Sequence, residues 1–131
     1  MATLHDDRIE ADNVAGPLTH HARGRADIPA LVHDARVLTY GALAPLVRRT
    51  AAAFYDRGLA PGDIAAVAMR DSIEHLVVLL ALARAGIVML PVDWRWNAEE
   101  QAGICRHFGA KLVAGEPGVP AVPGVTRLAI D

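Results

Sequence analysis

Two short apolar runs separated by a helix-forming segment constrain the fold of this chain more than any other feature. Ile64–Met69 and Ile87–Val92 contain almost no polar side chains, which is typical of strands buried on both faces of a parallel sheet. Between them, the segment from Ser72 to Gly86 is apolar around nearly its whole circumference, which indicates a buried helix. This alternation predicts parallel strands joined by right-handed helical crossovers.

A short β-hairpin and a helix are predicted before this run. Ala30–His33 and Arg36–Thr39 flank a tight turn that suits the aspartate and alanine between them. Thr39 can cap the helix that follows, in which Leu43 and Phe54 belong to one apolar stripe. A proline early in this helix predicts a kink in its first turns. Gly58 is expected to end the helix, because glycine adopts the left-handed conformation at low cost.

The remaining elements extend the same pattern. Asn97 can cap a third helix with two glutamates in its first turn, where carboxylates favour the helix dipole. The apolar side of this helix is predicted to hold Ala98, Ala102, Cys105 and Phe108. Lys111–Ala114 and Val125–Ile130 are predicted strands, separated by a proline-rich connector. The fold class is therefore α/β: a short β-hairpin, then a β-α-β-α-β parallel sheet with flanking helices.

Domain organisation divides the chain near residue 28. Residues 1–27 mix charges, proline and glycine without a clear period, which predicts a flexible N-terminal arm with room for one short helix. Residues 28–131 carry the regular pattern and form one partial subdomain.

Composition excludes several functional classes. The chain has 131 residues, 53% of them hydrophobic, with a formal net charge of −2. Without a basic excess, nucleic acid is not expected as a partner. The longest apolar run falls far below the roughly 20 residues that span a bilayer. One cysteine, Cys105, and a polar, acidic start without signal-peptide features favour a cytoplasmic protein without a membrane span.

No phosphate-binding loop is present in the sequence. The turns Arg70–Ser72 and Asp93–Asn97 could each present a helix N-terminus to an anion, or they could simply be caps. Trp94 and Trp96 flank Arg95 where a strand is expected to end, the edge at which open α/β sheets bind ligands. Packing of the two tryptophans against neighbouring structure is the competing interpretation.

Other reactive side chains have structural explanations. Ser72 lies three residues before His75 at a helix start, which is typical of a cap and not of a nucleophile with its base. His20 and His21 in a polar arm are expected to be solvated, and Cys105 is expected to be a buried, inert thiol. The sequence therefore predicts no catalytic residue and no metal site.

Four stretches, taken in order, resemble the start of the adenylate-forming (AMP-binding) superfamily. They cover roughly residues 28–131, and their joint order is more specific than any one of them. Departures from the family pattern are modest; one alanine, for example, replaces a frequent glutamate after Thr39. The stretches are Leu38–Ala44, Gly58–Val67, Asp71–Glu74 running into Ala81–Asp93, and Phe108–Val113.

The resemblance implies an ATP-dependent reaction, in which a carboxylate becomes an acyl-adenylate and then an acyl thioester. The Asp93-Trp94-Arg95 sequence is most similar to the acyl-CoA synthetase branch, and by resemblance these three residues are the candidate cofactor-binding residues. For a full-length member, the resemblance implies ATP, Mg²⁺ and a thiol acceptor that is usually CoA. The family's phosphate loop, ribose-binding aspartate and catalytic lysine have no counterpart in this chain. Lys111, the single lysine, belongs to a strand motif and does not match the catalytic lysine.

These observations favour an N-terminal fragment of an ATP-dependent acyl-CoA synthetase that is inactive alone and binds no cofactor tightly. Two alternatives stay open: a non-catalytic interaction module derived from that family, and an unrelated small α/β nucleotide-binding domain. The expected partner is the missing remainder of the enzyme or a complementing chain. Exposed apolar sheet edges also predict self-association.

Overall fold

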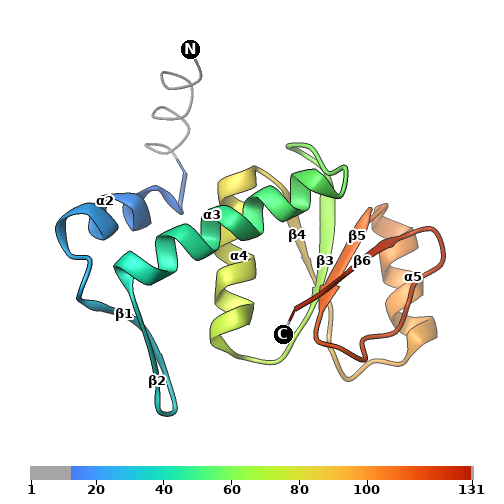
Figure 1. The fold of residues 1–131 in the computed structure, drawn as a ribbon. Helices are drawn as coiled ribbons and strands as arrows, with labels where there is room; N and C mark the ends of the chain where they lie inside the picture. The colour runs from blue at the N-terminus through green and yellow to red at the C-terminus, as the bar shows by residue number, and fades with distance from the viewer. Residues whose placement is uncertain (1–12, 131) are drawn as a thin grey trace.

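The computed structural model describes residues 13–130 of the chain (Figure 1). The described part consists of a helix, a β-hairpin and an α/β unit that follow one another along the chain. In order, the elements are α2 (Gly16–Gly24), β1 (Pro29–His33), β2 (Arg36–Thr39), α3 (Tyr40–Asp56), β3 (Ile64–Ala68), α4 (Ile73–Ala85), β4 (Val88–Pro91), α5 (Ala98–Phe108), β5 (Leu112–Gly115) and β6 (Thr126–Ala129).

The central sheet contains four parallel strands in the order β4-β3-β5-β6. Helices α3 and α4 lie on one side of it and α5 on the other (Figure 1). The connections from β3 to β4 and from β5 to β6 join neighbouring strands, whereas the connection from β4 to β5 passes across β3. All four strands run parallel, as alternating strands and helices require. The predicted α/β fold and the antiparallel hairpin β1-β2 are both confirmed.

The prediction that Ile87–Val92 forms a buried strand is wrong. Strand β4 lies at the edge of the sheet and pairs only with β3 among the described strands. Val88 is 51% exposed and Met89 41% exposed. An apolar run shows that a segment prefers burial, but it does not show how many neighbours the fold supplies. Strand β3, at the centre of the sheet, is buried as predicted.

Side-chain caps define where the three helices of the α/β unit begin. The hydroxyl oxygens of Thr39 and Ser72 accept N–H groups at the starts of α3 and α4, at 3.3 and 3.0 Å. Asn97 and Glu100 form a reciprocal capping box at the start of α5. The predicted caps are confirmed. The internal proline does not interrupt α3, which runs unbroken from Tyr40 to Asp56.

One aspartate organises the entrance to the sheet. The Asp63 carboxylate accepts the N–H of Ala60 at 2.8 Å, which closes the turn before β3. It also pairs with the Lys111 ammonium group, at 2.7 Å, just before β5. The hydrogen bond from Lys111 lowers the pKa of Asp63. The amine of Lys111 therefore connects the starts of two neighbouring strands.

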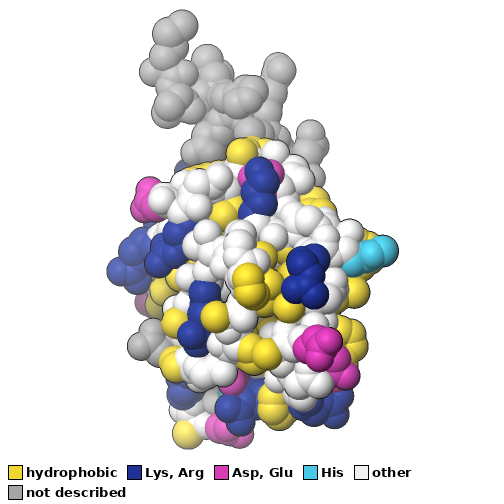
Figure 2. All heavy atoms as spheres, turned by 90° about the vertical axis from the view of Figure 1, so that its right-hand side faces the viewer, with side chains coloured by type: hydrophobic (Ala, Val, Ile, Leu, Met, Phe, Trp, Pro, Cys, Tyr) yellow, Lys and Arg dark blue, Asp and Glu magenta, His cyan; other side chains and the backbone are white. Residues whose placement is uncertain are grey.

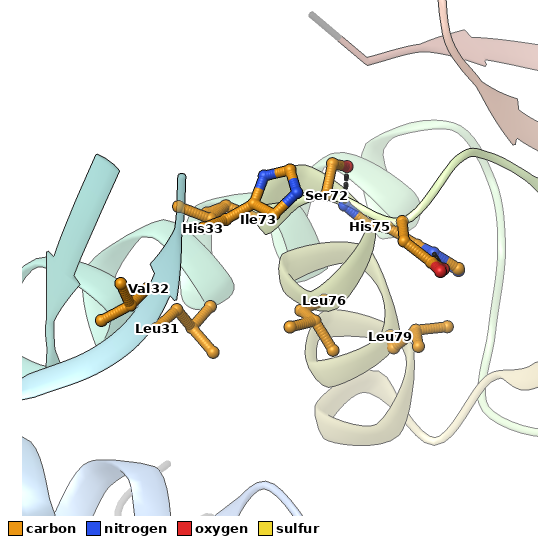
Figure 3. A pocket seen from close by; sticks show the side chains of 9 residues that line it. Leu31, Val32, His33, Ser72, Ile73, His75, Leu76 and Leu79 are labelled. Carbon is orange, nitrogen blue, oxygen red and sulfur yellow. Dashed lines mark hydrogen bonds and ion pairs between the residues drawn. The ribbon is translucent and has the colours of Figure 1, made fainter. Parts of the chain in front are cut away.

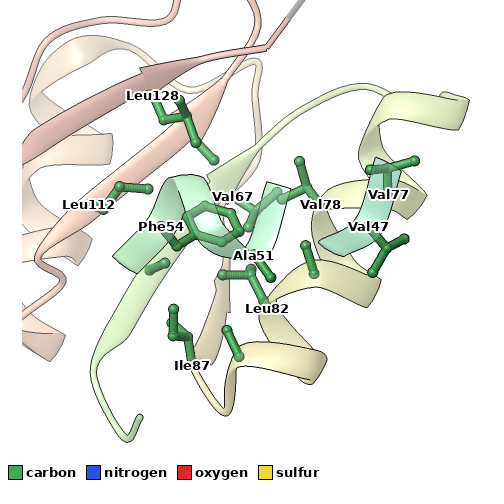
Figure 4. Close-up of a cluster of buried hydrophobic side chains, with 14 of the residues drawn as sticks. Val47, Ala51, Phe54, Val67, Val77, Val78, Leu82, Ile87, Leu112 and Leu128 are labelled. Atoms are coloured by element: carbon green, nitrogen blue, oxygen red, sulfur yellow. The ribbon is translucent and has the colours of Figure 1, made fainter. Parts of the chain in front are cut away.

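The larger core cluster fills the space between the sheet and helices α3 and α4 (Figure 4). Phe54, on α3, is fully buried there, beside Leu82 of α4 and Leu112 of β5. A smaller cluster, including Ala102 and Cys105, packs α5 against the opposite face of the sheet. The side chains at the centres of both clusters are apolar, as close packing requires.

Helix α5 buries a different set of side chains from the one predicted. Ala102 and Cys105 are buried, whereas Ala98 and Phe108 are exposed. Gln101 is 1% exposed, and its side-chain amide donates to the Trp96 carbonyl at 2.9 Å. This hydrogen bond satisfies the amide donor, whereas the buried Oε1 oxygen of Gln101 has no hydrogen-bond partner in the described part of the chain.

Helix α2 lies within the segment predicted to be a flexible arm. Leu18 packs against the larger core cluster, and Ala15, just before the helix, is buried. The Asn13 side chain donates to the Ala83 carbonyl of α4 at 2.5 Å. Residues 13–24 therefore contact the fold, while residues 1–12 of the predicted arm lie outside the described residues. The domain boundary at residue 28 stays a prediction.

Candidate functional site at the carboxyl edge of the sheet

Loops that follow three neighbouring parallel strands meet at the carboxyl edge of the sheet. Arg70 follows β3, Asp93-Trp94-Arg95 follows β4, and Glu116 follows β5. Parallel strands place these loops at one edge, which is where open α/β sheets bind ligands. We refer to Arg70, Asp93, Trp94, Arg95 and Glu116 as the edge cluster.

Arg70 is the centre of the edge cluster. Its guanidinium group contacts the Glu116 carboxylate at 3.0 Å through both Nε and Nη2. The backbone N–H of Arg70 donates to the same carboxylate at 3.2 Å. The guanidinium carbon lies 5.1 Å from the centre of the Trp94 ring, within the range of a cation–π interaction. Arg70 thus joins the loops that follow β3, β4 and β5.

Asp93 and Arg95 pair with each other. The Arg95 guanidinium donates to both carboxylate oxygens of Asp93, at 2.9 and 2.6 Å. The backbone N–H of Arg95 adds a third hydrogen bond at 2.9 Å. These side-chain and backbone hydrogen bonds lower the pKa of Asp93 to about 2. The pair is therefore ionised at neutral pH, and the aspartate offsets the positive charge of Arg95.

The helix N-termini beside the edge cluster are already occupied. Asn97 accepts the N–H groups of Glu99 and Glu100, each at 3.0 Å. The Glu100 carboxylate returns to the Asn97 N–H at 2.9 Å. Ser72 fills the corresponding position in α4, with Glu74 in the first turn. Capped N–H groups and nearby carboxylates make these two helix N-termini a poor match for a nucleotide phosphate.

An open groove of about 280 Å³ lies between the hairpin and α4 (Figure 3). Leu31, Leu76 and Leu79 contribute much of its apolar lining. The Ser72 oxygen accepts the backbone N–H of His75 at 3.0 Å, as Figure 3 shows. Ser72 therefore acts as the predicted cap, and the structure shows no serine–histidine side-chain hydrogen bond there.

The other reactive side chains occupy structural positions. Cys105 is buried, and its loss of solvent raises the pKa of the thiol, which keeps it protonated. His20 and His21 contact each other edge to face, and the His21 ring lies 5.0 Å from that of Tyr40. Within residues 13–130, no group of three or more His, Cys, Asp or Glu side chains could hold a metal ion.

The sequence located part of the edge cluster. Asp93, Trp94 and Arg95 were the candidate residues, and they lie together at the predicted edge. Trp94 is 45% exposed, with its ring beside Arg70. Glu116 was missed, because its only sequence signal is its position directly after a strand.

Charge is distributed evenly over the face of the molecule shown in Figure 2. On the face shown in Figure 2, basic and acidic side chains are scattered among apolar ones, and no continuous basic area is visible there. Among the described helices, none combines the length and hydrophobicity needed to cross a membrane.

Comparison with known proteins places this fold in a family. Residues 18–128 match the family described as AMP-binding enzyme. The fatty acid–[acyl-carrier-protein] ligase ScoC of Streptomyces coeruleorubidus is 31% identical over an alignment of 137 residues. The alignment covers 99% of this chain and 26% of ScoC. A probable non-canonical nonribosomal peptide synthetase, CymA of Salinispora arenicola, is 29% identical over 131 residues, covering 94% of the chain and 2% of CymA.

Solved structures agree with the sequence comparison. The N-terminal subdomain of Klebsiella oxytoca NpsA, in complex with 3-hydroxybenzoyl-AMSN, superposes with a TM-score of 0.77 and 27% identity. The match covers 89% of this chain and 30% of that one. The AMPPNP-bound form of the nonribosomal peptide synthetase FmoA3 gives 0.81 and 26%, covering 89% of this chain and 13% of that one. The chain thus spans a small part of the relatives it matches, and it belongs to the AMP-binding enzyme family.

Proposed function

We propose that this chain is the N-terminal part of an adenylate-forming enzyme and has no catalytic activity by itself. The observation that supports this proposal is coverage: the matches to ScoC and NpsA include 99% and 89% of this chain, but only 26% and 30% of those chains. The described residues contribute a folded α/β layer whose helix N-termini are capped by side chains of the chain itself.

The reaction of the complete enzyme follows from the family. A carboxylate oxygen attacks the α-phosphorus of ATP with Mg²⁺ bound, and pyrophosphate leaves. A thiol sulfur then attacks the acyl carbon, and AMP leaves. The acceptor is CoA in an acyl-CoA synthetase, while ScoC is named as a ligase to an acyl-carrier protein. We retain the CoA-dependent enzyme as the first candidate and the carrier-protein-dependent enzyme as the second.

We further propose that the edge cluster faces the ligand path in the complete enzyme. Trp94 offers an exposed aromatic face, and Arg70 holds it beside the loops that follow β3 and β5. The Asp93–Arg95 pair fixes the loop at the end of β4. A cytoplasmic location, where ATP and CoA are available, is part of the same proposal.

A chimaera tests the proposed function. This chain replaces the aligned 137-residue stretch of ScoC, and pyrophosphate release is measured with ATP, Mg²⁺ and a panel of carboxylates. We expect carboxylate-dependent release from the chimaera, and none from the chain alone or from ScoC without the stretch. Addition of CoA or of a carrier protein then identifies the acceptor. A folded chimaera without activity, or an active isolated chain, would contradict the proposal.

A further inference from the structure

Strand β6 lies at one edge of the sheet and, among the described strands, pairs only with β5 (Figure 1). The N–H groups of Thr126 and Ile130 donate to carbonyls of the β5 segment at 3.0 and 2.8 Å. Because alternate residues of a strand face the same neighbour, Arg127 and Ala129 direct their N–H and C=O groups away from β5. These four groups can bind one more strand.

The opposite edge of the sheet is less able to accept a strand. The N–H groups of Val88 and Val92 donate toward β3 at 2.8 and 2.9 Å. The alternation along the strand therefore directs the backbone polar groups of Met89 and Pro91 away from β3. Proline has no N–H, so this edge lacks one of the donors that β6 retains. Pro91 thus protects the β4 edge in the way that edge prolines commonly do.

The side chain of Arg127 leaves the β6 edge accessible. Its guanidinium group donates to the backbone carbonyl of Glu116 at 3.5 Å. Glu116 follows β5, so this contact turns the arginine back over its own sheet and away from the edge. An arginine pointing outward would instead oppose strand addition.

A groove with several apolar side chains lies beside the open edge. A groove of about 360 Å³ borders Ala129 and Ile130 at the end of β6. Leu46 of α3 and Val77 and Val78 of α4 also line it. The ion pair between Arg36 and Glu74, at 2.6 Å, also lines the groove, so its lining is mixed and not wholly apolar. A strand added to β6 would therefore find hydrogen-bonding groups on one side, with apolar side chains of the two helices and this ion pair nearby.

We propose that the β6 edge and this groove bind a β-strand from a polypeptide that carries the rest of an adenylate-forming domain. This inference rests on the proposed function. The chain covers only 30% of the NpsA N-terminal subdomain, so most of such a subdomain is available to pack against the described fold. Strand addition gives affinity through main-chain hydrogen bonds and specificity through alternate side chains.

The test mixes the purified chain with ScoC that lacks the aligned 137-residue stretch. Binding is measured by sedimentation, and amide hydrogen exchange is followed by NMR. We expect the Arg127 and Ala129 amides to exchange at least about tenfold more slowly in the complex, because each gains a hydrogen bond. The variant Ala129→Pro should weaken binding by at least about tenfold, since it removes one outward N–H and leaves every β5–β6 hydrogen bond intact.

The matched control is Met89→Pro, which removes an outward N–H from the other edge and should leave binding within about twofold of the unmodified chain. Circular dichroism must show that both variants fold. Amide hydrogen exchange in the unmodified chain tests the inference without any substitution. Absence of binding, or binding that leaves the Arg127 and Ala129 amides unprotected, would overturn the inference. Binding that slows exchange of the Arg127 and Ala129 amides, together with an inactive chimaera, would support strand addition while contradicting the proposed function.

Discussion

Replacement of Phe54 by alanine should remove a large part of the stability of this fold. Phe54 is fully buried between α3, α4 and the sheet. In Figure 4 its ring lies among Val67, Leu82 and Leu112. Loss of a buried aromatic side chain forfeits about 1.5–3 kcal/mol of transfer free energy, and the remaining cavity raises the total to about 3–5 kcal/mol.

This loss is large compared with the stability of an ordinary domain, which is about 5–15 kcal/mol. The free energy of unfolding can be measured by urea titration, followed by far-ultraviolet circular dichroism at 25 °C. The midpoint should fall while the slope stays unchanged, which would show that the native and unfolded states keep their compactness.

The matched control is Phe108→Ala, on the exposed side of α5. Phe108 is 48% exposed, so its truncation should cost less than about 1 kcal/mol. A Phe54→Ala variant that loses less than about 1.5 kcal/mol, or no more than the control, would refute the assignment of Phe54 to the centre of the core.

Three further changes test other parts of the structure. Gly115→Ala should destabilise the fold by about 1–3 kcal/mol in urea titration, because its new methyl carbon would clash with the Val119 side chain. Gly103→Ala, with no atom within 4 Å, should instead stabilise α5 by about 0.5–1 kcal/mol. Equal effects of the two substitutions would contradict this reasoning. The pKa of Asp93 should be about 2 by NMR because of its hydrogen bonds from Arg95, and Arg95→Ala should raise it toward about 3.9. Since the pair lowers this pKa, its stabilising contribution is present above about pH 4 and is lost as the pH falls toward 2. An NMR titration midpoint of Asp93 that Arg95→Ala leaves unchanged would show that the pair does not form in solution. Asn97→Ala should cost about 1 kcal/mol by removing the cap of α5, and an unchanged unfolding midpoint would count against that cap.

Local chemistry explains why most element boundaries could be predicted. Thr39, Ser72 and Asn97 cap the helices at whose starts they were placed, and Gly86 and Gly109 end two of them in the left-handed conformation. Caps and glycine ends depend on residues within one helical turn, so the sequence contains the information that they require.

Burial was predicted less well, because it depends on neighbours that are distant in sequence. Met89 belongs to an apolar run, yet it is 41% exposed at a sheet edge. Gln101 is polar, yet it is buried, with its side-chain amide donating to the Trp96 carbonyl. Neither outcome follows from hydrophobic periodicity, which reports preference and not position.

The sequence by itself determined the succession of strands and helices, their caps, and the family resemblance through turns such as the one before β3. Only the tertiary structure decided the strand order, and with it which edges stay open. It also brought Arg70, Trp94 and Glu116 together from three separate loops. The physical reason is that turns and caps arise from short-range contacts. The edge cluster and the free groups of β6 instead exist only once the strands have paired across the sheet.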